Sequence, residues 1–126
     1  MRNIFAAAAC VLILSLFIGL NGASGQKEGA APTFADVSAI FSKYNCTLCH
    51  GSVKASYGLA LHKYESLMKG SKNGPVIVPK DPAKSMLVRQ IKGEKQPRMP
   101  INGPPWVTEN EVQVIEKWIA AGAAKE

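Results

Sequence analysis

The sequence predicts an all-α fold, and three observations support this. Apolar residues recur at three- and four-residue spacing in several stretches, which is the period of an amphipathic helix. Capping boxes open two of these stretches, at Thr33–Asp36 and Thr108–Glu111. The one short β-type run, residues 76–78, has no visible partner strand, so no sheet is expected. At 126 residues, the chain is long enough for one domain.

The first 25 residues are typical of a secretion signal. Arg2 supplies a positive start, residues 4–20 form an apolar run, and Ala23 and Gly25 stand at positions −3 and −1 of a cut before Gln26. We expect cleavage there, then a flexible leader over residues 26–32 and the folded domain over residues 33–126. The alternative is an uncleaved anchor, because the apolar run is at the short edge for a membrane span.

Each capping box predicts a helix with one apolar face. The first helix is expected to begin after Thr33 and to run straight into Cys46. The last is expected to begin after Thr108 and to end at Gly122. The apolar positions of the two helices are Phe34, Val37, Ile40, Phe41 and Tyr44, and Val112, Ile115, Trp118 and Ile119.

Two further helices are expected between them. Residues 59–69 read as helix in their second half, stopped by Gly70. Asp81 followed by Pro82 predicts a helix start, and Gly93 its end. Residues 51–58 and 71–79 are expected to be loops, and residues 94–105 a stiff irregular segment because of their prolines.

The most informative stretch is Cys46-Thr47-Leu48-Cys49-His50. This is the C-x-x-C-H spacing of a c-type haem attachment site. Cysteines three apart lie on neighbouring corners of a helical turn, so both can bond the vinyl groups on one side of a porphyrin. His50 then supplies an imidazole to the iron. We therefore predict one covalently attached haem c, with His50 as the proximal iron ligand.

Other uses of this stretch are less consistent with the chain. A thioredoxin-type dithiol would need a βαβ context, which the flanks do not show. A zinc site would need more ligands, and downstream of His50 the chain has only His62 and no cysteine. A disulfide fits the spacing but gives His50 no role. Cleavage would remove Cys10 and leave no odd thiol in an oxidising compartment.

The candidates for the second iron ligand are three methionines, Met68, Met86 and Met99, and one histidine, His62. Met68 and Met86 lie on expected helices, where methionine usually fills the core. Met99 lies instead in the stiff proline-rich segment, where no helical face explains an apolar side chain. We predict Met99 as the distal ligand, which gives the His/Met arrangement of electron carriers. His62 is expected at the surface, and an open sixth position remains the other alternative.

The charge of the chain bears on its partners. Removing residues 1–25 takes away one charged residue, Arg2, and lowers the formal charge from +6 to +5. The lysines are spread along the chain and do not form a nucleic-acid-binding run. An excess of lysine on an exported protein favours a redox partner with an acidic docking surface, although solvated lysines explain it equally well. Membrane contact is expected only through an uncleaved N-terminal segment.

Several stretches extend the haem motif into a longer, collinear pattern. They are Cys46–Gly51, Gly58–Leu61, Gly74–Pro79, Asp81–Leu87, Met99–Pro100 and Trp118–Ala123. Through them, residues 34–124 resemble class I monohaem cytochromes c, and are most similar to the short planctomycete-type domains of bacterial exported proteins. The chain departs from many of those relatives at Arg98 and in the bulky segment Gly103–Trp106.

The resemblance implies the cytochrome c fold, with the first and last helices crossing beside a haem ligated by His50 and Met99. It also implies a carbonyl near Pro75 or Pro79 as acceptor of the hydrogen bond from His50. The apolar shell expected around the haem is Phe34, Ile40, Phe41, Leu59, Val78, Leu87, Ile91 and Trp118.

We therefore expect a bacterial, periplasmic or otherwise exported protein that carries single electrons between redox partners and is not itself an enzyme. One alternative is a haem enzyme or gas sensor with an open iron position. A second is a colourless interaction module built on zinc or a dithiol. A third, compatible with the carrier, is an electron-transfer subunit of a larger dehydrogenase or respiratory complex.

Overall fold

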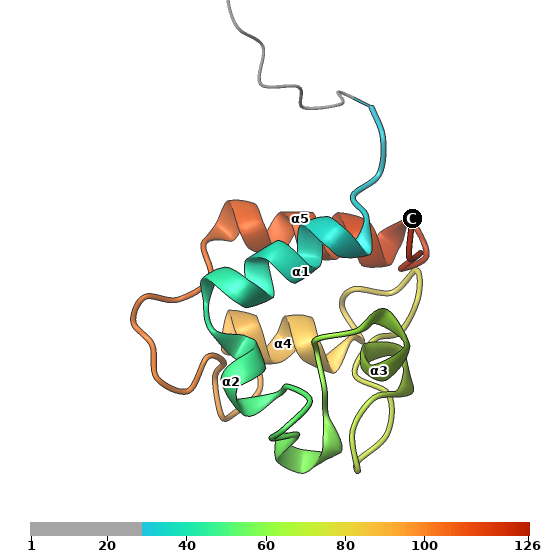
Figure 1. Cartoon of the computed structure of the whole chain (residues 1–126). Helices are drawn as coiled ribbons and strands as arrows, with labels where there is room; N and C mark the ends of the chain where they lie inside the picture. Colours follow the sequence, from blue (N-terminus) through green and yellow to red (C-terminus); the bar gives the residue numbers. More distant parts are fainter. Residues whose placement is uncertain (1–28) are drawn as a thin grey trace, which may run out of the picture.

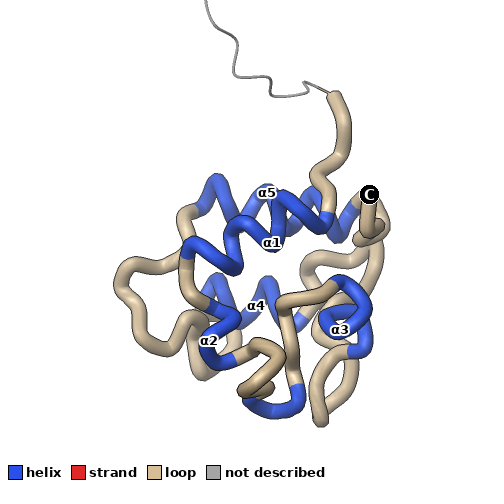
Figure 2. Tube along the Cα trace, in the orientation of Figure 1, coloured by secondary structure: helices blue, strands red, loops and turns tan. Residues whose placement is uncertain are grey.

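The structure, a computed structural model, describes residues 29–126, and this part is helical with no strand (Figures 1 and 2). Its elements are α1 (Phe34–Lys43), α2 (Cys46–Cys49), the 3₁₀ turn η1 (Ser56–Gly58), α3 (Tyr64–Lys69), α4 (Met86–Lys92) and α5 (Glu109–Ala120). The all-α prediction is confirmed for these residues. The expected signal, residues 1–25, lies outside them. None of the described helices is long and apolar enough to cross a bilayer.

Both predicted capping boxes are present. At the start of α1, the Thr33 backbone N–H and hydroxyl both donate to the Asp36 carboxylate, at 2.7 and 2.8 Å. At the start of α5, the Thr108 N–H and hydroxyl donate to Glu111 at 3.1 and 2.6 Å. Each box satisfies donors that the first helical turn leaves without an intrahelical partner. The sequence therefore specified where both long helices begin.

The apolar faces of α1 and α5 pack against each other to form one side of the core (Figure 1). The Trp118 side chain is fully buried, its ring centroid 6.3 Å from that of Phe34, and its indole N–H donates to the Ala124 carbonyl at 2.7 Å. The Phe34 N–H donates to Lys125 O, which ties the C-terminal end of the chain to the start of α1. The expected crossing of first and last helices is thus present.

The expectation that the first helix continues into Cys46 is wrong. α1 ends at Lys43, and Asn45 adopts a left-handed conformation, with φ 53°, before α2 begins at Cys46. Asparagine tolerates this conformation better than most residues because its short polar side chain can bond locally. The turn lets α2 leave the axis of α1, so the Cys46 segment has its own orientation.

The start of α4 also differs from the prediction. The helix begins at Met86 after Ser85, and not at Asp81 and Pro82. The Asp81 carboxylate instead accepts a hydrogen bond from the Lys84 N–H, at 3.0 Å, within a preceding turn. The buried Ser85 hydroxyl accepts from Val78 N–H and donates to the Asp81 carbonyl, each at 2.9 Å. Asp81 therefore caps this turn and not the helix that follows it.

The remaining elements match the sequence expectations more closely. α3 ends at Gly70, α4 ends at Gly93, and the residues between Gly93 and Thr108 contain no helix or strand. α3 is joined to the C-terminal end of the chain by a hydrogen bond from the Tyr64 hydroxyl to the Ala123 carbonyl, at 3.0 Å. Residues 76–78 form no strand.

Candidate functional site

α2 brings Cys46, Cys49 and His50 onto a single helical turn, as the spacing predicts. The turn continues through His50, whose backbone N–H donates to Cys46 O at 2.9 Å. The His50 carbonyl accepts from Leu61 N–H at 2.7 Å, and Gly51 N–H donates to Lys54 O at 2.7 Å. The loop after the motif therefore folds back and holds the backbone of His50 in place.

The two cysteines of the motif have different environments. Both are free thiols, which leaves the disulfide alternative without support. Cys46 is half-buried against the apolar core, and this burial raises the pKa of its thiol. Cys49 is exposed. One sulfur therefore faces the protein interior and the other faces outward.

His50 is half-buried, and only one of its ring nitrogens is enclosed. The enclosed atom is Nδ1, which has no hydrogen-bond partner among the described residues. The expected hydrogen bond from His50 to a carbonyl near Pro75 or Pro79 is therefore not formed. With Nδ1 turned toward the protein, Nε2 is the nitrogen left to bind a metal.

The other histidine and the zinc alternative can be placed as well. His62 is half-buried, with an enclosed and unpartnered Nδ1, so it is less exposed than the expected surface residue. Within residues 29–126 no three His, Cys, Asp or Glu side chains are grouped to hold a metal ion. A zinc site built on Cys46 and Cys49 therefore gains no support.

The methionines separate as the sequence suggested. Met68 and Met86 are half-buried on α3 and α4 and pack against the core, as fillers do. Met99 is half-buried in the irregular segment between α4 and α5, and its backbone N–H donates to Gln90 O, in the last turn of α4, at 2.9 Å. It is thus the one methionine of these three that no helix carries.

The segments that hold the haem motif and Met99 meet in space. A small cavity of about 90 Å³ separates the end of α1 from the proline-rich segment. Its lining residues are Lys43, Tyr44, Asn45, Pro100, Asn102 and Pro105. Asn45 directly precedes Cys46 and Pro100 directly follows Met99, so the fold brings these two chain segments together although about fifty residues separate them.

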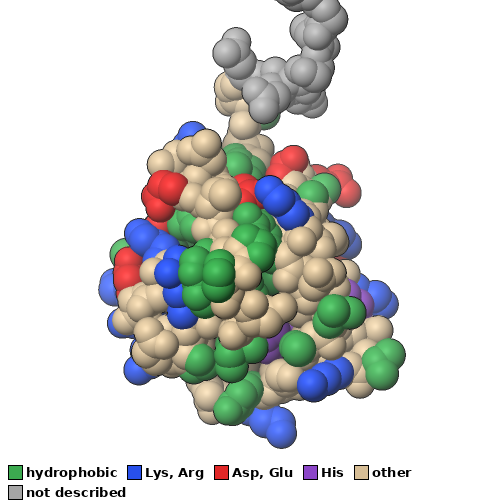
Figure 3. Space-filling view, turned by 90° about the vertical axis from the view of Figure 1, so that its left-hand side faces the viewer, with side chains coloured by type: hydrophobic (Ala, Val, Ile, Leu, Met, Phe, Trp, Pro, Cys, Tyr) green, Lys and Arg blue, Asp and Glu red, His purple; other side chains and the backbone are tan. Residues whose placement is uncertain are grey.

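The face that carries α2 and the proline-rich segment is rich in apolar side chains. Figure 3 shows hydrophobic groups gathered there, with a histidine set back between them. The large apolar side chains that are most exposed in the described chain are Leu48, Val53, Tyr57, Val78 and Ile101. Cys46, in the motif itself, is half-buried against the core. Thiols, an accessible imidazole nitrogen, a thioether and apolar surface fit a porphyrin with its iron.

The side chains predicted to form the apolar shell differ in their burial. Ile40, Phe41, Leu87, Ile91 and Trp118 are buried, and Phe34 and Leu59 are half-buried against the core. Val78, in contrast, retains 37% of its surface. Its backbone N–H and C=O are both held by Ser85, and this leaves the side chain on the outside. Irregular backbone has no regular repeat, so the sequence does not show which of its side chains will be buried.

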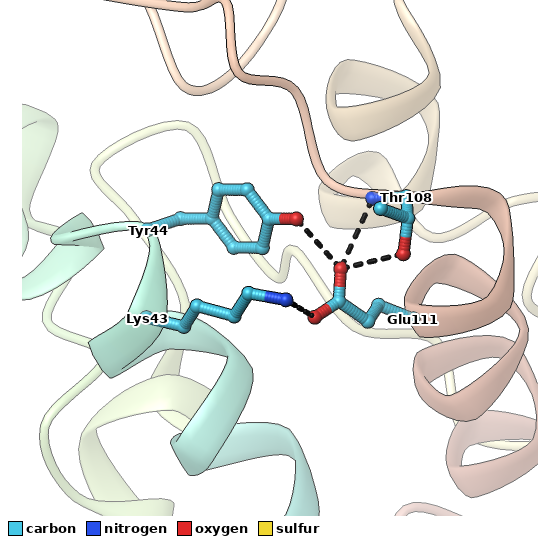
Figure 4. Close-up of polar contacts among 4 residues, drawn as sticks. All are labelled: Lys43, Tyr44, Thr108 and Glu111. Atoms are coloured by element: carbon cyan, nitrogen blue, oxygen red, sulfur yellow. Dashed lines mark hydrogen bonds and ion pairs between the residues drawn. The ribbon is translucent and has the colours of Figure 1, made fainter.

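Glu111 has a second role that the capping box did not reveal. Its carboxylate accepts from the Tyr44 hydroxyl and from the Lys43 ammonium, both at 2.6 Å, as well as from Thr108 (Figure 4). Partial burial alone would raise its pKa, but the hydrogen bonds from Lys43, Thr108 and Tyr44 outweigh it and lower the pKa to about 2. The end of α1 is thereby fastened to the start of α5, beside the turn into Cys46.

The two departures from the family pattern are also in contact with each other, a relationship that no sequence pattern indicates. The Arg98 guanidinium lies over the Trp106 ring, 4.3 Å from its centroid. Trp106 in turn lies against Gly103, where an added Cβ would come within 2.4 Å of the ring. The Arg98–Trp106 contact joins the two sides of Met99, and the Trp106–Gly103 contact lies within its C-terminal side.

Comparison with known proteins bears directly on this site. Residues 46–103 match a family model described as planctomycete cytochrome c. No curated protein and no solved structure matches the chain. The matched range begins at Cys46 and includes His50 and Met99. In this family the cofactor is a covalently bound haem c with its iron. Membership of the family suggests electron transfer rather than catalysis. The match therefore supports a cytochrome c domain of the planctomycete type over residues 46–103.

Proposed function

We propose that this protein is an exported electron carrier with one His/Met-ligated haem c. When bound, haem c supplies reversible one-electron chemistry at its iron. The observation that carries the proposal is the arrangement of α2, where two free thiols and a histidine with Nε2 available occupy one turn. The family match over the same residues supports the same cofactor.

Each site residue then has a distinct role. Cys46 and Cys49 would hold the porphyrin through thioether bonds, and His50 would ligate the iron through Nε2. Met99 is proposed as the distal ligand, because it is half-buried in a segment that α4 anchors through Gln90. Ligation by a thioether together with an imidazole would favour the reduced iron and raise the potential. Buried side chains of α1, α4 and α5 would exclude water from this region.

The proposed partners are redox proteins with acidic docking surfaces. The formal charge of +6 comes mostly from lysines, and Lys54, Lys72, Lys80 and Lys95 are exposed. Exposed apolar side chains lie within the motif and directly after it, Leu48 and Val53 among them. Apolar contacts surrounded by lysines suit transient docking guided by charge. We propose an exported location, periplasmic in a bacterium, which the N-terminal signal pattern supports.

The experiment that tests the proposal is an absorption spectrum of protein expressed in cells able to mature c-type cytochromes. We expect covalently retained haem, a six-coordinate spectrum in both oxidation states, and no binding of carbon monoxide by the reduced protein at neutral pH. Rapid carbon monoxide binding would instead indicate an open iron position, as in an enzyme or gas sensor. Colourless protein from such cells would exclude haem altogether.

A further inference from the structure

The proline-rich segment is anchored unevenly. On its N-terminal side, Met99 N–H donates to Gln90 O, Lys95 N–H donates to Arg89 O, and the Gln90 side chain donates to Pro97 O. On its C-terminal side, residues 101, 102, 104 and 105 are exposed, and Gly103 N–H donates only to the nearby Pro100 carbonyl. Met99 thus lies where an anchored half meets a half with few contacts of its own.

One set of side-chain contacts bridges the two halves. The Arg98 guanidinium carbon lies 4.3 Å from the centroid of the Trp106 ring, well within cation–π range. The Arg98 Nε–H also donates to the Ile91 carbonyl of α4 at 3.4 Å. Arg98 therefore connects α4 to Trp106 through one side chain. Because Arg98 directly precedes Met99, the connection passes beside the proposed ligand.

Two glycines provide the space for these contacts. An added Cβ at Gly93 would lie 3.0 Å from Arg98 Cδ, and one at Gly103 would lie 2.4 Å from two carbons of the Trp106 ring. Gly103 is in the tighter position, so any side chain there would displace the ring. We name the four residues Gly93, Arg98, Trp106 and Gly103 the Arg98–Trp106 brace.

Arg98 forms no ion pair within the described chain. The ion pairs there involve Lys43, Lys84, Lys92 and Lys125, and none involves Arg98. Arg98 and Trp106 are both half-buried, so the guanidinium is partly removed from water against the ring. The Arg98 guanidinium therefore contacts an aromatic ring and one carbonyl instead of a carboxylate, and these contacts hold two parts of the chain together.

We propose that Arg98 and Trp106 are positioning residues that keep the Met99 segment closed, so that the Met99 thioether resists replacement by an external iron ligand. This inference rests on the proposed His50/Met99 ligation. Opening the brace would free the weakly anchored half of the segment. Met99 would then leave more readily, and a competing ligand would bind more tightly, since its binding would no longer have to break the brace.

The test is imidazole binding to the oxidised holoprotein, followed through the loss of the weak near-infrared band of the methionine–iron bond. We expect Trp106→Leu and Arg98→Leu to bind imidazole about tenfold more tightly than the unsubstituted protein. Trp106→Phe, which keeps an aromatic face, should bind within about threefold of it. Lys95→Ala, an exposed position in the same segment, is the matched control and should show no change.

A second measurement separates positioning from general stability. Amide hydrogen exchange of the oxidised holoprotein should become faster over residues 97–106 in Trp106→Leu, with exchange in α1 and α5 unchanged. Unchanged imidazole affinity in both leucine variants, or an equal rise in Lys95→Ala, would overturn the brace while leaving the proposed function intact. A methionine–iron band that survives in Met99→Ala would overturn the ligand assignment itself, and the brace with it.

Discussion

The Tyr44 hydroxyl donates a hydrogen bond of 2.6 Å to Glu111, across 67 residues of sequence. Tyr44 is two residues before Cys46, and Glu111 is in the first turn of α5. The same carboxylate accepts from Lys43 and from Thr108. One side chain therefore caps the last helix and fixes the end of the first, directly before the haem motif.

Replacing Glu111 by glutamine should destabilise the fold. The amide keeps the size of the side chain but loses the charge that strengthens four hydrogen bonds from three residues, so we expect the free energy of unfolding to fall by about 1–2 kcal/mol. We keep this value low because the partner Lys43 is 61% exposed and solvent screens that pair. Guanidinium unfolding followed by circular dichroism measures the change. Glu65→Gln, in the exposed pair with Lys125, is the control and should leave stability unchanged.

Stability should also depend on pH through Glu111. Its pKa in the folded protein is about 2, against 4.5 for an unperturbed glutamate, so the folded state favours the carboxylate. The stabilisation is therefore complete above about pH 5 and is lost as pH falls toward 2. Unfolding curves at pH 6, 4 and 3 should show the loss, and Glu111→Gln should reduce its size. An identical pH profile in both proteins would assign the acid sensitivity to other carboxylates.

Met99→Ala should abolish the near-infrared methionine–iron band and lower the reduction potential. We expect a fall on the order of 0.1 V, a small part of the roughly 0.8 V over which axial ligands tune haem potentials. Spectroelectrochemical titration measures both quantities. Met86→Leu is the matched control, because Met86 is also half-buried but packs from α4 against the core. Loss of the band in Met86→Leu and not in Met99→Ala would move the ligand to α4.

The two cysteines should contribute separately to haem attachment. Cys46→Ala or Cys49→Ala should leave haem attached through a single thioether, in reduced yield, and the double variant should retain none covalently. Haem staining after denaturing electrophoresis, together with intact mass, distinguishes these products. Full covalent attachment in the double variant would show that the cofactor is bound elsewhere in the chain.

Electron transfer to an acidic redox protein should slow as salt is raised. Between about 10 mM and 150 mM ionic strength the screening length falls from about 30 Å to about 8 Å, so steering by exposed lysines weakens. A rate decrease of about tenfold or more is expected in stopped-flow measurements. Reduction by a neutral small molecule provides the control and should change little. A flat dependence with the acidic partner would remove lysine steering without affecting the haem assignment.

Local signals were sufficient for much of this protein. The capping boxes at Thr33 and Thr108, the stop at Gly70 and the spacing of Cys46, Cys49 and His50 depend on residues within one helical turn of each other. Each was therefore readable without knowledge of the fold, and each is present in the structure. The prediction was wrong where one local signal fits two structures. Asp81 can cap a helix or a turn, and in this protein it caps a turn, while Ser85 precedes the helix.

By itself, the sequence determined the helical class, the two long amphipathic helices and the chemistry of the haem motif, because these follow from short-range periodicity and spacing. Only the tertiary structure decided how Asn45 turns α2 away from α1, that Glu111 receives Tyr44, and that Arg98 lies on Trp106. These contacts join residues that are distant along the chain or held in irregular backbone. No repeating sequence pattern marks such pairs, because the two side chains come into contact and stabilise the fold only after folding has brought their segments together.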